Sequence, residues 1–255
     1  MKNNAYVICL CFLLILVAGC TDKKNTGSYT VSGSIKNHYR TSLQLFEITP
    51  SQNYLISNIP VQKNGNFEID FTAREKSIYG ISNGRNFIFF INDAPELKIE
   101  TSEDEFENYF VEDSPLSEQL RQLIATDKKL ATEVGFAEKL LISKMVKGNE
   151  KFGYNPEILD LENKADKRSL ERRTYIVNFM DTVQDKLLAI AASSLLIMNE
   201  DFNYLELFYD RIKSMPISKR QKEDLRIELD KMRRSFKSIA PITTIGAIDR
   251  SKHPL

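Results

Sequence analysis

The hydrophobic pattern of this chain changes its period at Asp113-Ser114-Pro115, and that change limits the folds available to it. From Tyr29 to about Val111, apolar residues alternate with polar ones, which is typical of half-buried β-strands. After Ser114 they recur every three or four residues, which is typical of amphipathic helices. The sequence therefore predicts an α+β protein, with an N-terminal antiparallel β-sandwich-like domain at 29–112 and an all-helical C-terminal domain at 113–238.

Turn and strand signals divide the first domain into about seven strands. The segment from Phe67 to Phe71 (FEIDF) alternates strictly, and Asn64-Gly65 precedes it. That dipeptide favours a type I′ hairpin turn with positive φ at both residues. Between Tyr54 and Val61 the apolar residues shift from one alternating set of positions to the other, which predicts a bulge near Ser57-Asn58.

One strand is expected to be buried on both faces. Asn86 to Ile91 (NFIFFI) is apolar without alternation, which predicts a central strand covered on each side. Phe89 lies within this run and Phe67 begins the alternating strand. We therefore expect both phenylalanines in one hydrophobic core.

Capping residues mark where the helices begin. Ser114 is suited to an N-cap, Pro115 to the first helical position and Glu118 to a capping box. Helical stripes then recur, one of them formed by Ile176, Phe179, Met180, Val183 and Leu187. Residues 147–156 and 214–218 break the helical pattern, and 187–198 is expected to be a single core helix that is too short to span a membrane.

The N-terminus resembles a bacterial lipoprotein signal. Ala5 to Ala18 is an uncharged apolar run after Lys2, and Val17-Ala18-Gly19-Cys20 resembles a lipobox. We expect a signal peptide at 1–19, lipidation of Cys20, a tether at 20–28 and a C-terminal tail at 239–255. Asp22 is followed by two lysines, which favours a periplasm-facing anchor in the outer membrane. An ordinary cleaved signal, with Cys20 incidental, is the alternative.

Composition excludes several functional classes. The 35 basic residues balance the 35 acidic ones, so no nucleic-acid partner is expected. Cys9 and Cys11 would leave with the signal peptide and lipid would occupy Cys20, while His38 and His253 are the two histidines. The mature chain would therefore lack the side chains needed for thiol chemistry, His-based metal sites or catalytic triads. We predict no catalytic, cofactor-binding or metal-ligating residue and no cofactor, with Cys20 as the site of lipidation.

Three other sequence patterns could suggest a binding site, but each has a simpler structural interpretation. The acidic run Glu100–Asp113 lacks the spacing of a calcium loop, and Lys219–Lys237 is basic but interrupted by acids. Five aromatic residues could in principle stack on sugars: Tyr29, Tyr39, Tyr54, Tyr79 and Phe87. We expect a solvated linker, a mixed-charge helix face and core or cross-strand packing, respectively.

Short segments resemble a known family. They are YTVSGSIKN (29–37), NGNFEIDF (64–71), YGIS (79–82), NFIFFI (86–91) and VEDSPLSEQL (111–120). Together they resemble the domain of unknown function that precedes the thioredoxin domain in TlpA-like, AhpC-TSA-type envelope lipoproteins. Residues 175–232 are similar to that family's linker helices. The resemblance implies a following thioredoxin fold with a CxxC motif, but the chain stops at Leu255, roughly where that fold would begin.

These patterns lead to one functional expectation and two alternatives. We expect a membrane-anchored envelope lipoprotein that acts as a non-catalytic binding or scaffold module. Its partner, an envelope protein or a small ligand, would bind the β domain or the groove between domains. The first alternative is a truncated or split TlpA-like thiol–disulfide oxidoreductase lacking its redox domain. The second is a hydrolase that uses an Asp/Glu pair, which sequence spacing alone cannot identify.

Overall fold

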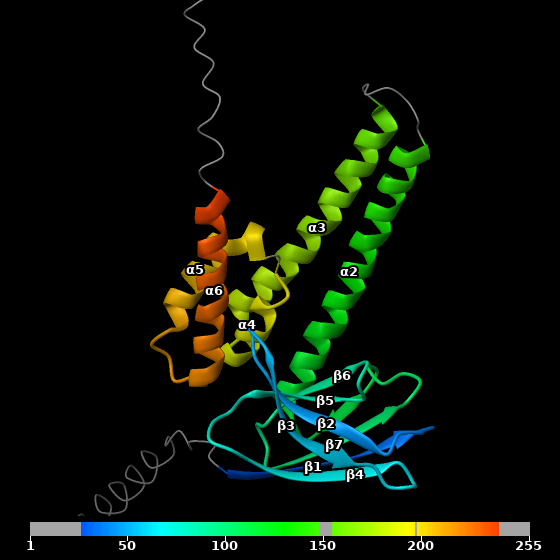
Figure 1. Cartoon of the computed structure of the whole chain (residues 1–255). Helices are drawn as coiled ribbons and strands as arrows, with labels where there is room; N and C mark the ends of the chain where they lie inside the picture. The colour runs from blue at the N-terminus through cyan, green and yellow to red at the C-terminus, as the bar shows by residue number, and fades with distance from the viewer. Residues whose placement is uncertain (1–26, 148–154, 197, 240–255) are drawn as a thin grey trace, which may run out of the picture.

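A computed structural model describes residues 27–147, 155–196 and 198–239, and within them strands precede helices, which confirms the α+β class (Figure 1). The strands are β1 (Gly27–Lys36), β2 (Ser42–Ile48), β3 (Asn53–Pro60), β4 (Asn66–Ala73), β5 (Ile78–Ser82), β6 (Phe87–Ile91), β7 (Glu96–Ser102) and β8 (Phe110–Glu112). The helices are α2 (Pro115–Lys147), α3 (Pro156–Thr182), α4 (Lys186–Ser193), α5 (Met198–Ile212) and α6 (Lys219–Ile239).

The strands form two four-stranded sheets, ordered β4-β1-β7-β8 and β3-β2-β5-β6. Most neighbours are antiparallel as expected, but β1 and β7 are parallel, with Val31 opposite Leu97. Alternation reports which face of a strand is buried and not the direction of its neighbour, so the sequence could not reveal this pairing. Close approach here requires Gly33, since a Cβ atom on it would lie 2.3 Å from the Ile99 carbonyl oxygen.

Two hydrophobic clusters lie on opposite faces of the second sheet. One joins buried side chains of both sheets, among them Val31, Ile99 and Phe90. The other joins the helices to Ile78 and Ile91. Phe67 belongs to the first cluster, whereas Phe89 packs against the second, so the expectation of one shared core was wrong. Alternation along β6 sends neighbouring side chains to opposite faces.

Strand β6 is covered on both faces as predicted, but it lies at an end of its sheet and not at the centre. Side-chain hydroxyls occupy its outer edge. The Tyr109 hydroxyl accepts from the Phe89 N–H at 3.2 Å and donates to the Phe89 carbonyl at 3.0 Å. The Ser117 hydroxyl accepts from the Ile91 N–H at 2.9 Å. These bonds satisfy backbone groups that would otherwise be buried and unpaired.

The predicted hairpin turn has a different type, and the predicted bulge lies one residue earlier than expected. Gly65 has a φ of +85°, but Asn64 is not in the positive-φ region, and the Gly65 N–H donates to the Gln62 carbonyl. The loop is therefore a type I-like turn followed by a left-handed glycine and not the predicted type I′ turn. The register of β2 and β3 shifts so that Ile56 is the extra residue, next to the expected bulge at Ser57-Asn58.

The helices begin and end near their predicted breaks. Ser114 is the N-cap as predicted, and its hydroxyl accepts from the Ser117 N–H at 3.2 Å. Glu118 does not complete a capping box, because its carboxylate pairs with Arg121. The stripe from Ile176 to Leu187 is divided between α3 and α4, and residues 187–198 are not one helix, since α4 ends at Ser193.

Helix α6 returns the chain to the sheets. The Glu75 carboxylate accepts from the Ser218 hydroxyl at 2.7 Å and from the Lys219 N–H at 3.1 Å, at the N-terminus of α6. Asp224 is buried and accepts hydrogen bonds from the hydroxyls of Thr49 and Tyr54. The last helix is thus tied to the strands through polar contacts.

Strand β1 and helix α6 each extend slightly past the ranges that the sequence assigned to the folded parts. Gly27 and Ser28, assigned to the tether, pair with Ala73 and Thr72 as the start of β1. Helix α6 includes Ile239, assigned to the tail. The signal segment 1–19, Cys20 and the rest of the tail lie outside the described residues. Among the helices that the structure describes, none is long and apolar enough to cross a membrane.

Candidate functional site

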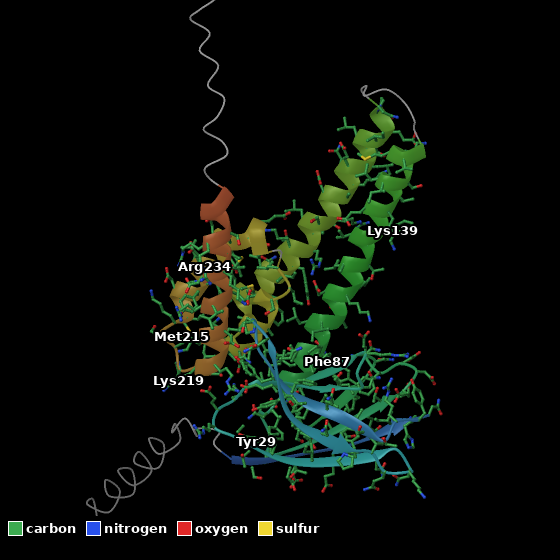
Figure 2. The ribbon with its side chains drawn as sticks, viewed as in Figure 1. Tyr29, Phe87, Lys139, Met215, Lys219 and Arg234 are labelled. Atoms are coloured by element: carbon green, nitrogen blue, oxygen red, sulfur yellow. The ribbon has the colours of Figure 1, made fainter. Side chains whose placement is uncertain are left out.

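The distal halves of α2 and α3 form an antiparallel pair that extends away from the sheets (Figure 1). We define the helical arm as residues 128–147 of α2 and 156–171 of α3. Twenty helical residues in α2 make the arm roughly 30 Å long at 1.5 Å per residue. In Figure 2, Lys139 marks this part of α2.

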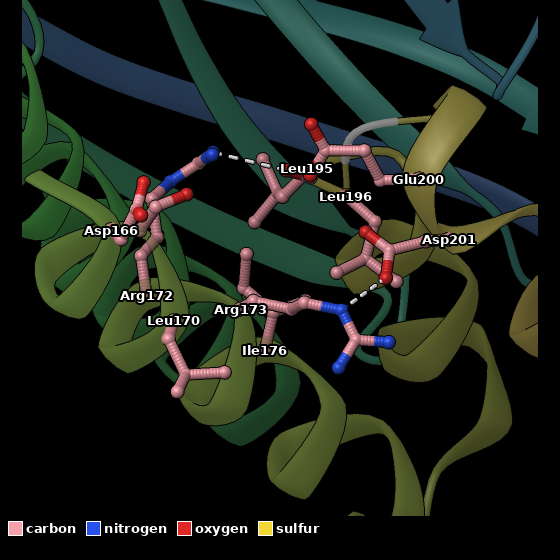
Figure 3. A pocket seen from close by; sticks show the side chains of 10 residues that line it. Asp166, Leu170, Arg172, Arg173, Ile176, Leu195, Leu196, Glu200 and Asp201 are labelled. Carbon is pink, nitrogen blue, oxygen red and sulfur yellow. Dashed lines mark hydrogen bonds and ion pairs between the residues drawn. The ribbon is translucent and has the colours of Figure 1, made fainter. Parts of the chain in front are cut away.

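A partly buried ion pair lies at the base of the arm. Arg172 of α3 donates to both carboxylate oxygens of Asp127 in α2, at 2.7 and 3.2 Å. The same guanidinium donates to the Leu195 carbonyl at 3.0 Å, which joins α3 to the segment after α4 (Figure 3). A bidentate pair of this kind fixes both distance and orientation. It marks the level at which α4 stops supporting the two long helices.

Beyond this pair the interface between the two helices is thin. Ala165 is the one fully buried residue among the arm side chains that the structure describes. The residues beside it are half-buried, as with Val134, Leu141, Ile158 and Leu161. A pair of helices can cover only one side of each member. The arm therefore keeps large apolar side chains in solvent.

Exposed apolar residues concentrate on this arm. Among the described residues, seven of the twelve exposed large hydrophobic side chains belong to it: Phe136, Leu140, Ile142, Met145, Val146, Leu159 and Leu170. Phe136 is 65% exposed and Val146 is 75% exposed. Single exposed apolar residues are ordinary, but a contiguous group marks an interaction surface.

A groove of about 640 Å³ runs between the two helices of the arm. The groove is lined from α2 by Thr132, Glu133, Phe136, Ala137 and Leu140, and from α3 by Leu161, Lys164, Lys167 and Arg168. Lys164 pairs with Asp160 at 2.6 Å and Arg168 with Glu171 at 2.7 Å. Lys167 makes no ion pair with any described residue. The groove therefore combines apolar side chains with paired charges, and Lys167 is its one cation without an ion pair to a described residue.

A second, smaller pocket of about 270 Å³ lies near the arm's base (Figure 3). Arg173 enters it and pairs with the buried carboxylate of Asp201 in α5. Arg172 is already held by Asp127 and Leu195. Because both guanidiniums have partners from the chain itself, this pocket is best explained as a polar joint between α3 and α5.

The other candidates from the sequence do not assemble into a site in the described residues. In the acidic run, Glu103 is buried and accepts from Arg40 at 2.6 Å. Within the described ranges, no group of three or more His, Cys, Asp or Glu residues is placed to hold a metal ion. Tyr29 and Tyr79 are core residues, whereas Tyr39 is 68% exposed, so the five aromatic residues do not form one platform.

The basic run in α6 forms the mixed-charge face that was predicted. Arg226 pairs with Glu223 at 2.5 Å and with Asp230 at 3.0 Å, and Lys231 pairs with Glu228 at 2.6 Å. These contacts neutralise the helix locally. Cys20 lies outside the described residues, so its lipidation stays a prediction.

The helical arm was missed at the sequence level, where binding was expected on the β domain or between the domains. A signal for it was present, because Phe136 and Leu140 are four residues apart and lie off the stripe formed by Leu130, Val134 and Leu141. Two apolar stripes on one helix require two partners. Within the arm, the described residues supply one such partner, which is α3.

No protein-family model matches the chain, and no curated protein matches it. Its function must be inferred from its own residues.

Proposed function

We propose that this protein is a lipid-anchored envelope lipoprotein that acts as a non-catalytic binding or scaffold module, with a partner protein docked on its helical arm. The observation that supports this role is the concentration of exposed apolar side chains on the arm. Many exposed apolar side chains on one pair of helices are costly in water unless another surface covers them.

A protein suits this surface better than a small molecule does. The groove is open, and exposed apolar residues outside it lie along most of the arm's length. Small-ligand sites enclose most of the ligand, whereas elongated grooves between helices receive an amphipathic helix. Lys167, which makes no ion pair with a described residue, would select among such helices by charge.

The proposed anchor precedes the sheets in the chain, and the proposed docking surface extends away from the sheets. Cys20 precedes the first described residue, Gly27, by seven positions, and β1 begins among the sheets. The arm extends away from those sheets (Figure 1). A lipid on Cys20 would hold the sheets near the membrane and leave the arm free to reach a partner. The Val17–Cys20 lipobox supports this anchor.

We also carry forward the finer architecture and the family resemblance as proposals. The two sheets would form a β-sandwich at 29–112, followed by a helical domain at 113–238. The cluster shared by side chains of both sheets supports this arrangement. The resemblance to the module that precedes the thioredoxin domain in TlpA-like lipoproteins fits an accessory, non-catalytic role.

Single-cysteine labelling tests whether the arm is covered in the envelope. The described residues contain no cysteine, so Phe136→Cys would add one reactive thiol to a lipidated mature chain. Leu207→Cys on α5 is a matched control, because Leu207 and Phe136 are each 65% exposed. We expect a maleimide to label the Phe136→Cys variant at least several-fold more slowly in intact envelopes than in dilute purified protein. The Leu207→Cys rate should be the same in both. Equal rates for Phe136→Cys would refute docking on the arm.

The anchor has an independent test. Cys20→Ser removes the acceptor thiol, and the described helices include no membrane span that would retain the chain. We expect the protein to move from the membrane fraction to the soluble fraction. Mass spectrometry of the wild-type N-terminus should show an acylated cysteine. A free amine on another residue would contradict the lipoprotein assignment.

A further inference from the structure

We propose that the partner on the helical arm is a second copy of this chain, bound head to tail, so that one flank of the first arm meets the opposite flank of the second. This inference rests on the proposed role of the arm as a docking surface. It is carried by how charge and apolar residues divide between the two sides of α3.

Three positions of α3 define the side that faces α2. Ile158, Ala165 and Arg172 are seven residues apart, Ala165 is buried, and Arg172 reaches Asp127 of α2. At 100° per residue, Lys164 and Lys167 lie to one side of this line, and Glu162 and Asp166 lie to the other. The two groups are therefore on opposite flanks of the arm.

The groove and the pocket agree with this division. Leu161, Lys164, Lys167 and Arg168 line the groove together with Phe136 and Leu140, and we call this side the basic flank. Asp166 and Leu170 line the separate pocket near Arg173. Leu159, Glu162, Asp166 and Leu170 form one stripe, at spacings of three, four and four residues, and we call this side the acidic flank.

The charges of α3 that lack partners are sorted between these flanks. Within the described arm, the charged residues of α3 that make ion pairs are Glu157, Asp160, Lys164, Arg168 and Glu171. Three others make none with described residues: Lys167 on the basic flank, and Glu162 and Asp166 on the acidic flank. The same angular count of 100° per residue places Lys139 of α2 on the side of Glu162 and Asp166. This flank is therefore acidic on α3 and not on α2.

Exposed apolar residues occur on both flanks. Phe136 and Leu140 lie on the basic flank, whereas Leu159 and Leu170 lie on the acidic flank, where Ile142 and Val146 of α2 fall as well. A single foreign helix in the groove would cover one flank and leave the other in water. A second copy bound head to tail covers the basic flank of one arm with the acidic flank of the next.

Charge also selects this geometry over a symmetric dimer. A two-fold contact between basic flanks would bring Lys167 near its own copy, and a contact between acidic flanks would do the same for Asp166. Opposite flanks place these two residues across the interface from each other. The contact is therefore heterologous and repeats from one copy to the next on the membrane surface.

Charge reversal on two differently tagged copies in the same cells tests this arrangement. Lys167→Glu and Asp166→Lys change exposed residues, so both variants should keep the wild-type circular dichroism and melting temperature. Copies that all carry Lys167→Glu, or all carry Asp166→Lys, should co-purify roughly tenfold less than wild type, equivalent to ~1.4 kcal/mol. Pairing one variant with the other restores opposite charges and should restore co-purification. Lys63→Glu, on an exposed turn away from the arm, should have no effect.

The outcomes separate this inference from the proposed function. If single variants co-purify as well as wild type, or if the mixed pair is not rescued, head-to-tail pairing is refuted. If wild-type copies do not co-purify while Phe136→Cys is still protected in envelopes, the partner is a different protein and the docking role survives. If neither protection nor self-association is seen, both proposals fail.

Discussion

The Tyr109→Phe variant tests how the outer edge of β6 is stabilised. The Tyr109 side chain is buried, and its hydroxyl satisfies both the N–H and the carbonyl of Phe89. Phenylalanine fills nearly the same volume but leaves both backbone groups without that partner. Each unsatisfied buried group costs about 1–3 kcal/mol, so leaving both unpaired should cost ~2–6 kcal/mol at pH 8. That is a large share of typical domain stability.

The same residue predicts a pH dependence. Burial raises the pKa of Tyr109 from 10.0 to about 12. Because the folded pKa is the higher one, its contribution to stability is complete below pH 10 and is lost as pH rises through 12. At pH 11 the wild type should have lost ~1.4 kcal/mol through this residue. Tyr109→Phe cannot lose that contribution, so the stability gap between the two proteins should narrow by that amount.

Urea unfolding at pH 8 and pH 11 measures both effects. Burial also raises the pKa of Tyr79, but Tyr79 is present in both proteins and its effect cancels in the comparison. Tyr39→Phe is the control, because Tyr39 is 68% exposed and its loss should change stability little. A Tyr109→Phe variant as stable as wild type at pH 8, or a gap that does not change with pH, would refute this account of the edge.

Three further variants test the core and the arm's base. Gly33→Ala should prevent β1 from packing on β7, because its Cβ would lie 2.3 Å from the Ile99 carbonyl oxygen; loss of cooperative melting would show this. Phe67→Ala should cost ~3–5 kcal/mol in urea unfolding, because Phe67 is 2% exposed, and a melting temperature within a degree of wild type would contradict that burial. Asp127→Asn should cost ~3 kcal/mol by leaving the Arg172 guanidinium without a carboxylate partner, and unchanged hydrogen exchange along α3 would disprove its role at the base.

Local chemistry explains what the sequence predicted well. The change from strand to helix period was expected at Ser114, and α2 begins at Pro115 because serine and proline suit those two positions in any tertiary context. The mixed charges of α6 also pair within three or four residues, so spacing alone was sufficient.

Contacts between distant segments explain the errors. Phe89 and Phe90 are adjacent and equally apolar, yet α2 and Tyr109 decide that one faces the helices and the other faces the sheets. Glu118 was expected to cap the helix, but Arg121 lies within reach and holds its carboxylate. The parallel pairing of β1 with β7 depends on strands between them that belong to the other sheet.

The arm was hidden from the sequence for a related physical reason. A stripe such as Phe136 and Leu140 has the same spacing whether a third helix covers it or water does. The base of the arm resolves the ambiguity, because the Arg172 guanidinium that holds Asp127 also holds the Leu195 carbonyl after α4. Below that point α3 is packed by α4, and beyond it α2 is the main neighbour, although Asp166 and Leu170 still line a pocket with Leu195 and Leu196. Another chain docked on the arm would therefore give this part of α2 and α3 a third packing partner, which the rest of the helical region already has.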